Sequence, residues 1–171
     1  VIMSVGPYFN HLSEVGVGDA VTNPERIRTL LDPTIPNHPN PRFHDFLNDA
    51  KVMEAGYTWV QVDLRGTGAS TGCLDWNGPG EQQDVVTAVE WAAVQPWSNG
   101  RVGLFGKSYD GVTGLIAAGN QPRGLAAVVA QEPAMEPYTY LYNNEVPYYN
   151  AIGTSLSYDE IAVSYTHLRA H

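Results

Sequence analysis

Hydrophobic positions follow two different patterns along the chain. Short apolar runs bounded by turn residues are typical of buried strands, and residues 1–5, 57–62, 101–105 and 125–130 have this pattern. Apolar residues at helical spacing predict amphipathic helices over residues 43–53, 85–93 and 109–120. Strands and helices alternate at short spacing. The pattern therefore predicts an α/β fold with a mostly parallel sheet flanked by helices.

Segments rich in proline or glycine separate these predicted elements. Five prolines fall between residues 10 and 42, which predicts a long loop there. Residues 63–80 form a glycine-rich segment that also reads as a loop. Its glycines could suggest a phosphate cradle, but the segment lacks the Gly-Lys-Ser/Thr ending and no helix follows at once. A nucleotide-binding domain is therefore a disfavoured alternative, and we expect no cofactor.

Composition narrows the range of partners. The chain has 171 residues, about one domain, and a formal net charge of −9. That charge disfavours nucleic acids and anionic membranes, which both need basic surface. No apolar run approaches the roughly 18 residues of a membrane span. A single cysteine, Cys73, excludes an internal disulfide. His38 and His44 lack a completing carboxylate pattern, so no metal site is expected either.

The strongest chemical motif is the sequence from Gly106 to Gly111, which reads Gly-Lys-Ser-Tyr-Asp-Gly. Its serine, Ser108, stands between a predicted strand and a predicted helix, which is the setting of a nucleophile elbow. The usual glycine two residues after the serine is replaced by Asp110. The first amide of the helix, that of Tyr109, could face a developing oxyanion. The alternative is that Ser108 only caps the helix.

Four sequence blocks resemble one family when taken in order. They are Gly6-Pro7-Tyr8, Asp63 to Gly72, Trp97-Ser98-Asn99-Gly100 and the motif around Ser108. Together they are similar to the cocaine-esterase / X-Pro dipeptidyl-peptidase family of α/β-hydrolases, whose elbow reads Gly-x-Ser-Tyr-x-Gly. The resemblance implies the central portion of an α/β-hydrolase fold. It makes Ser108 the nucleophile, the Tyr109 backbone N–H one oxyanion donor and the Tyr8 phenol the second.

The aspartate and histidine that would activate the nucleophile are harder to assign than the nucleophile itself. The resemblance implies the order Ser, Asp, His, yet only Asp159 and the late His167 follow Ser108 as candidates. His11, His38 and His44 precede it. The chain also lacks an initiator Met, and its last residues, 163–171, change character. We therefore expect a piece of a larger serine hydrolase, with 163–171 a non-native tail and the piece inactive alone.

The resemblance also divides the chain. Residues 1–132 would be a partial hydrolase core, and residues 133–162 the start of a cap. The substrate would be a small molecule or peptide, hydrolysed at an Xaa-Pro, ester or amide bond through an acyl-enzyme. In the cap, Glu136 or Glu145, or Glu132 just before it, could bind a substrate ammonium, or the segment could only pack on the sheet. A non-catalytic α/β binding module is the alternative function.

Overall fold

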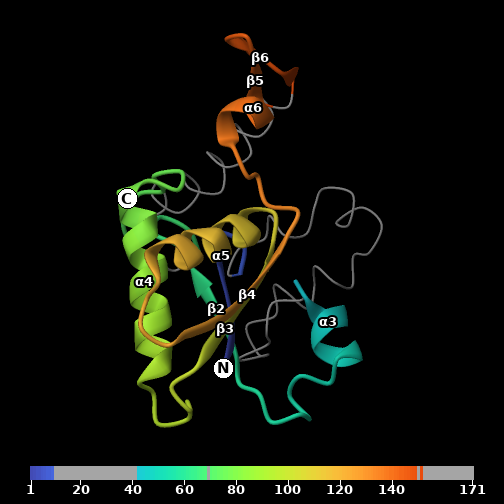
Figure 1. Cartoon of the computed structure of the whole chain (residues 1–171), viewed down its shortest axis with the longest axis vertical. Coiled ribbons are helices and arrows are strands. Elements are labelled where there is room, and N and C mark those ends of the chain that lie inside the picture. Colours follow the sequence, from blue (N-terminus) through green and yellow to red (C-terminus); the bar gives the residue numbers. More distant parts are fainter. Residues whose placement is uncertain (10–41, 69, 150, 152–171) are drawn as a thin grey trace, which may run out of the picture.

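The fold is built on a small parallel sheet. The structure is a computed structural model that describes residues 1–9, 42–68, 70–149 and 151. Four strands form the sheet in the order β2-β1-β3-β4, and each neighbouring pair is parallel. They are β1 (Ile2–Gly6), β2 (Trp59–Asp63), β3 (Val102–Lys107) and β4 (Leu125–Gln131). All four predicted strands are confirmed, with bounds that differ from the prediction by at most two residues. The α/β fold class is confirmed as well (Figure 1).

The helices match the predictions less evenly. They are α3 (His44–Asp49), α4 (Pro79–Ala93), α5 (Tyr109–Asn120) and α6 (Pro137–Leu141). The prediction for α5 is confirmed. Helix α4 begins earlier than predicted, because Pro79 at its start has a φ suited to a first helical turn. Helix α3 stops before the predicted end at residue 53, since Lys51 has left-handed backbone geometry, with φ 51°.

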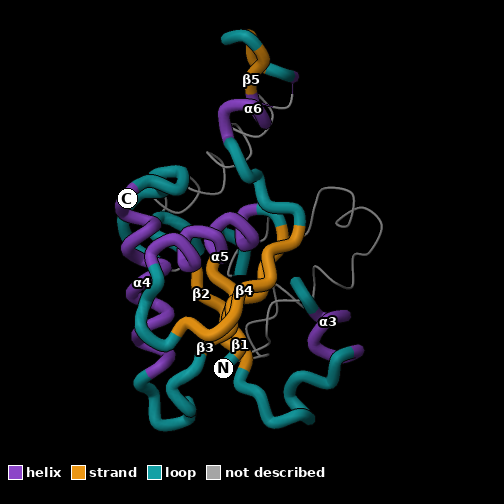
Figure 2. The backbone as a smooth tube through the Cα atoms, viewed as in Figure 1, coloured by secondary structure: helices purple, strands orange, loops and turns teal. Residues whose placement is uncertain are grey.

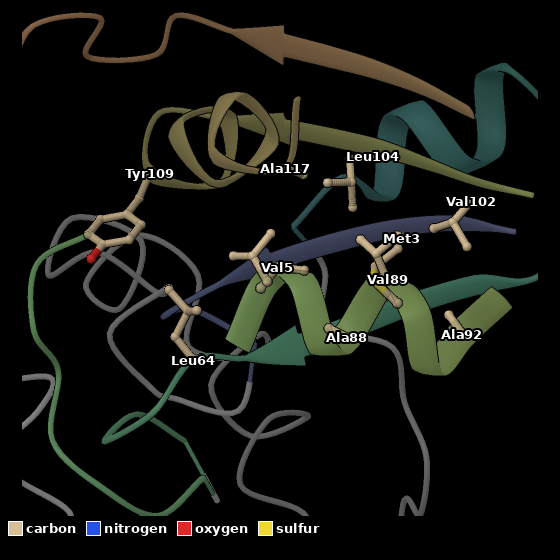
Figure 3. Packing of buried hydrophobic residues seen from close by; sticks show 11 residues of the cluster. Met3, Val5, Leu64, Ala88, Val89, Ala92, Val102, Leu104, Tyr109 and Ala117 are labelled. Carbon is tan, nitrogen blue, oxygen red and sulfur yellow. The ribbon is translucent and has the colours of Figure 1, made fainter. Parts of the chain in front are cut away.

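The two faces of the sheet are covered differently. Leu104 of β3 belongs to the buried cluster under α4 and α5 (Figure 3), whereas the next residue, Phe105, stacks on Phe46 of α3 with ring centroids 3.8 Å apart. Successive strand residues point to opposite faces. Helices α4 and α5 therefore pack on one face and α3 on the other. The main core lies on the α4–α5 side, where Met3, Val5, Val85, Val89 and Val102 are fully or almost fully buried.

The chain leaves the sheet after β4. There α6 leads into a short antiparallel pair, β5 (Tyr142–Asn143) and β6 (Val146–Pro147), which projects away from the strands (Figures 1 and 2). Five tyrosines of this projection are exposed, namely Tyr138, Tyr140, Tyr142, Tyr148 and Tyr149. In the part of the chain that the structure describes, no helix is long and apolar enough to cross a bilayer.

Candidate active site

The turn between β3 and α5 carries Ser108. This residue has φ 60° and ψ −119°, a combination that costs free energy for any residue with a side chain. Two backbone hydrogen bonds hold it there: Ser108 N–H donates to the Gln131 carbonyl at 2.9 Å, and Val112 N–H donates to the Ser108 carbonyl at 3.0 Å. Its side chain is exposed and makes no capping hydrogen bond. The turn therefore presents a hydroxyl to solvent, and the helix-cap interpretation is wrong.

Small residues make this sharp turn possible. A Cβ atom on Gly106 would lie 2.2 Å from the carbonyl oxygen of Asp110, and one on Gly111 would lie 2.9 Å from that of Gln131. Asp110 fits where a second glycine is usual, because its side chain lies beneath the end of β1. A Cβ on Gly6 would be 1.7 Å from Asp110 Oδ1. The space for the aspartate is thus provided by Gly6 on another strand.

Tyr109 begins α5 and is anchored from below. Its side chain is buried, and its Oη donates a hydrogen bond of 2.5 Å to Glu81 Oε2. Glu81 is fully buried and also accepts the backbone N–H groups of Asp75 at 2.8 Å and Asn77 at 2.9 Å. The amides of a first helical turn have no acceptor within the helix and point out of its end. The hydrogen bond to Glu81 thus restrains Tyr109, the first residue of α5, beside Ser108.

Tyr8 follows the carboxyl end of β1, the neighbour of β3. Its segment is tied to β2, because Phe9 N–H donates to Asp63 Oδ1 at 2.9 Å. The Arg42 guanidinium carbon lies 4.2 Å from the centroid of the Tyr8 ring. Ligands of open α/β sheets bind outside the carboxyl ends of the strands. The structure therefore brings Ser108, Tyr109 and Tyr8 to the edge where such a site belongs.

Charged groups surround the elbow. The Asp110 side chain is fully buried and accepts from Arg42 Nε at 2.6 Å. Lys107 Nζ lies 3.2 Å from Glu132 Oε2, an exposed pair at the ends of β3 and β4. The Glu136 side chain, in contrast, caps a helix, because it accepts hydrogen bonds from the backbone N–H groups of Tyr138 and Thr139 at the start of α6. The Thr139 N–H is the main reason that the pKa of Glu136 is below its ordinary value.

A second ionic network supports the start of α4. Arg65 makes a two-point contact with Asp84, with both distances 2.7 Å, and this contact raises the pKa of the guanidinium. Asp75 accepts the N–H groups of Gly80 at 2.8 Å and Glu81 at 3.1 Å. Desolvation raises the pKa of Asp75, but these hydrogen bonds outweigh it, so the pKa is lowered. The glycine-rich loop is therefore tied to α4 by its own side chains.

Other candidate residues do not join the site. Cys73 is exposed. In the described ranges no group of three His, Cys, Asp or Glu side chains could hold a metal ion. An open groove of about 950 Å³ lies along the outer edge of β2, with Gln61, Arg65, Asp84 and Trp91 among its lining residues. Ser108, Tyr109 and Tyr8 do not line it, so it is separate from the elbow. His11, His38, Asp159 and His167 lie outside the described residues.

Sequence analysis missed two residues that the structure ties to the elbow. Glu81 holds Tyr109, and Arg42 reaches Asp110 and Tyr8. One signal for Glu81 was present, because an acidic residue in the first turn after Pro79 is typical of a helix start. No local signal marks Arg42, since its partner Asp110 is 68 residues away.

A parallel sheet with helices on both faces and a serine on a strained strand-to-helix turn defines the α/β-hydrolase class. Comparison with known proteins agrees. The model of the X-Pro dipeptidyl-peptidase (S15) family matches residues 1–169, and the chain belongs to this family. A CocE/NonD family hydrolase from Staphylococcus aureus has the same fold, with a TM-score of 0.61 at 24% identity over 94% of this chain and 28% of its own.

Two curated relatives are similar over the core. A Mycobacterium bovis protein named "Putative serine esterase" is 35% identical over 91 residues, 52% of this chain and 14% of the relative. A Streptomyces avermitilis protein named "Putative Xaa-Pro dipeptidyl-peptidase" is 31% identical over 118 residues, 60% of this chain and 18% of the relative. The chain thus spans less than a fifth of the length of these relatives.

Proposed function

We propose that the whole protein is a serine hydrolase that works through an acyl-enzyme, with Ser108 as its nucleophile. The observation that carries this proposal is the exposed Ser108 hydroxyl on a turn with φ 60° at the carboxyl edge of the sheet. Backbone strain of this kind persists only where the surrounding structure holds it, and it concentrates at functional sites. Two candidate substrate classes, an Xaa-Pro peptide and an ester, follow the names of the relatives. The third, an amide, follows the family resemblance.

In the proposed reaction, Ser108 Oγ attacks the substrate carbonyl carbon while a base takes the hydroxyl proton. The carbonyl oxygen becomes an oxyanion, which the Tyr109 N–H and the Tyr8 hydroxyl stabilise by hydrogen bonds. A phenol suits this role because it keeps its proton at neutral pH. The intermediate then collapses, the amine or alcohol leaves with a proton, and water hydrolyses the Ser108 ester.

The base and its acidic partner are proposed to lie outside the described residues. After Ser108 the sequence has two aspartates, Asp110 and Asp159, and no histidine before His167. Asp110 belongs to the elbow itself, where its buried side chain pairs with Arg42. We propose that the 171 residues alone hydrolyse esters poorly, because a serine hydroxyl without a base is a weak nucleophile. The same proposal divides the chain into a core at 1–132, the start of a cap at 133–162 and a tail at 163–171.

An irreversible fluorophosphonate probe tests the proposed nucleophile. We expect one probe molecule per molecule of the whole protein, and peptide mapping by mass spectrometry should locate it on Ser108. A panel of Xaa-Pro anilides, amino-acid anilides and simple p-nitrophenyl esters should then identify the substrate class. Absence of labelling, with no turnover of any member of the panel, would favour a non-catalytic binding module.

Replacing Tyr8 with phenylalanine tests the second oxyanion donor. Loss of one such donor costs about 10²-fold or more in kcat in a comparable serine hydrolase. We therefore expect Tyr8→Phe to lower kcat about 100-fold with little change in KM, measured on the best substrate of the panel. Tyr57→Phe is the matched control, because Tyr57 is exposed and lies at the opposite end of the sheet, before β2. Equal kcat values for Tyr8→Phe and the unaltered protein would remove Tyr8 from the mechanism.

A further inference from the structure

Arg42 contacts two parts of the proposed oxyanion site at once. Its Nε donates to the buried Asp110 Oδ2 at 2.6 Å, and its Nη2 donates to the carbonyl of Lys107 at 2.8 Å. Lys107 is the residue just before Ser108. The guanidinium also lies over the Tyr8 ring, with its carbon 4.2 Å from the ring centroid. One side chain therefore touches the elbow on one side and the phenol on the other.

The chemistry of arginine explains why it can make all three contacts. A guanidinium is planar, so it donates hydrogen bonds within its plane and stacks on an aromatic ring with its face. Asp110 fixes the guanidinium, because a fully buried carboxylate needs a hydrogen-bonded cation. The position of the Tyr8 ring is in turn restricted by the fixed guanidinium. A donor must be held within about 0.5 Å of its productive position to stabilise a transition state.

We infer that Arg42 is a positioning residue, which sets the Tyr8 phenol relative to the Ser108 elbow. The inference rests on the proposed function, since it assumes that Tyr8 donates to the oxyanion. The competing explanation is that Arg42 only neutralises Asp110 and stabilises the fold. If Arg42 only neutralises Asp110, a lysine in its place should keep both the fold and the activity. If Arg42 positions Tyr8, a lysine should keep the fold but lose activity.

Arg42→Lys in the whole protein separates them. A lysine keeps a charge for Asp110 but has no planar group to place over Tyr8. We expect kcat to fall about tenfold while KM and the melting temperature change little. Arg123→Lys is the matched control, because the Arg123 side chain is 90% exposed and pairs with Glu90 at 3.4 Å. It should leave kcat within twofold.

Two further variants make the test decisive. In the double variant Arg42→Gln/Asp110→Asn no buried charge is left unpaired, so folding should be retained while kcat stays low. In a Tyr8→Phe background, Arg42→Lys should lower kcat by less than twofold more, because the phenol that it positions is gone. Unchanged kcat in Arg42→Lys, recovery in the double variant or an additive loss with Tyr8→Phe would overturn the inference. A normal kcat in Tyr8→Phe alone would instead contradict the proposed role of Tyr8.

Discussion

Replacing Ser108 with alanine is expected to lower kcat of the whole protein about 10⁴- to 10⁶-fold. The variant has no hydroxyl to form the ester intermediate, so only direct attack by water remains. The oxyanion donors and the bound substrate geometry would still be present, and they alone give some acceleration over solution. KM should therefore change much less than kcat. Initial rates at high enzyme concentration, together with loss of fluorophosphonate labelling, measure this effect.

Ser108→Gly extends the same prediction to stability. The residue has φ 60°, which glycine adopts at little cost and serine does not. Ser108→Gly should be as inactive as Ser108→Ala. Its free energy of unfolding should be about 1 kcal/mol higher than that of the unaltered protein, because backbone strain of this kind costs of order 1–3 kcal/mol. A stability gain together with lost activity would identify strain that is kept for function.

Ser98→Ala is the matched control for both variants. Ser98 lies in the turn before β3, where its Oγ accepts the Gly100 N–H at 3.1 Å. Its replacement should leave kcat within twofold. If Ser108→Ala kept a tenth or more of the activity, another residue would have to be the nucleophile.

Local patterns were sufficient to predict most of the fold. The strands β1 to β4 are short apolar runs between turns that contain glycine or proline. Such a run can be recognised from adjacent residues alone, without knowledge of distant contacts. The elbow was also predicted locally, because a strand, a small-residue motif and a helix follow one another from 102 to 120. The Pro79 start of α4 was missed, since the loop assignment extended to residue 80.

The support of the elbow could not be predicted in the same way. Asp110 fits because Gly6, 104 residues earlier, leaves space for its carboxylate, and because Arg42 neutralises it. Tyr109 is anchored by Glu81, 28 residues before it. Each of these contacts joins segments that only the folded sheet brings together. Sequence reasoning proposed the reacting groups, whereas the contacts that support them are buried polar contacts between segments far apart in the sequence.

The two buried carboxyl groups have separate tasks in this arrangement. Asp110 connects the underside of α5 to Arg42 and thus to the segment that carries Tyr8. Glu81 connects the start of α4 and its preceding loop to the ring of Tyr109. Both proposed oxyanion donors are therefore held by residues outside the turn itself.

The Glu81 network predicts the largest effect on stability. Replacing Glu81 with alanine removes the acceptor for three buried or half-buried donors, the Tyr109 hydroxyl and the N–H groups of Asp75 and Asn77. Each donor left unsatisfied costs about 1–3 kcal/mol. We expect the free energy of unfolding to fall by about 3–5 kcal/mol in total. The melting temperature should fall by about 10 °C, given a shift of about 2–4 °C per kcal/mol for a chain of this size.

Two comparisons show whether this loss comes from the network. Glu54→Ala removes a carboxylate whose side chain is 75% exposed and 3.9 Å from Lys51, so it should change the free energy of unfolding by less than about 0.5 kcal/mol. Tyr109→Phe removes a single donor and leaves the two amide contacts of Glu81 in place. It should cost about 1 kcal/mol, the usual net value of one hydrogen bond. Equal losses in Glu81→Ala and Glu54→Ala would mean that the buried carboxyl group does not hold the elbow. A large loss confined to Glu81→Ala would mean that this buried carboxyl group of α4 stabilises the structure around the elbow.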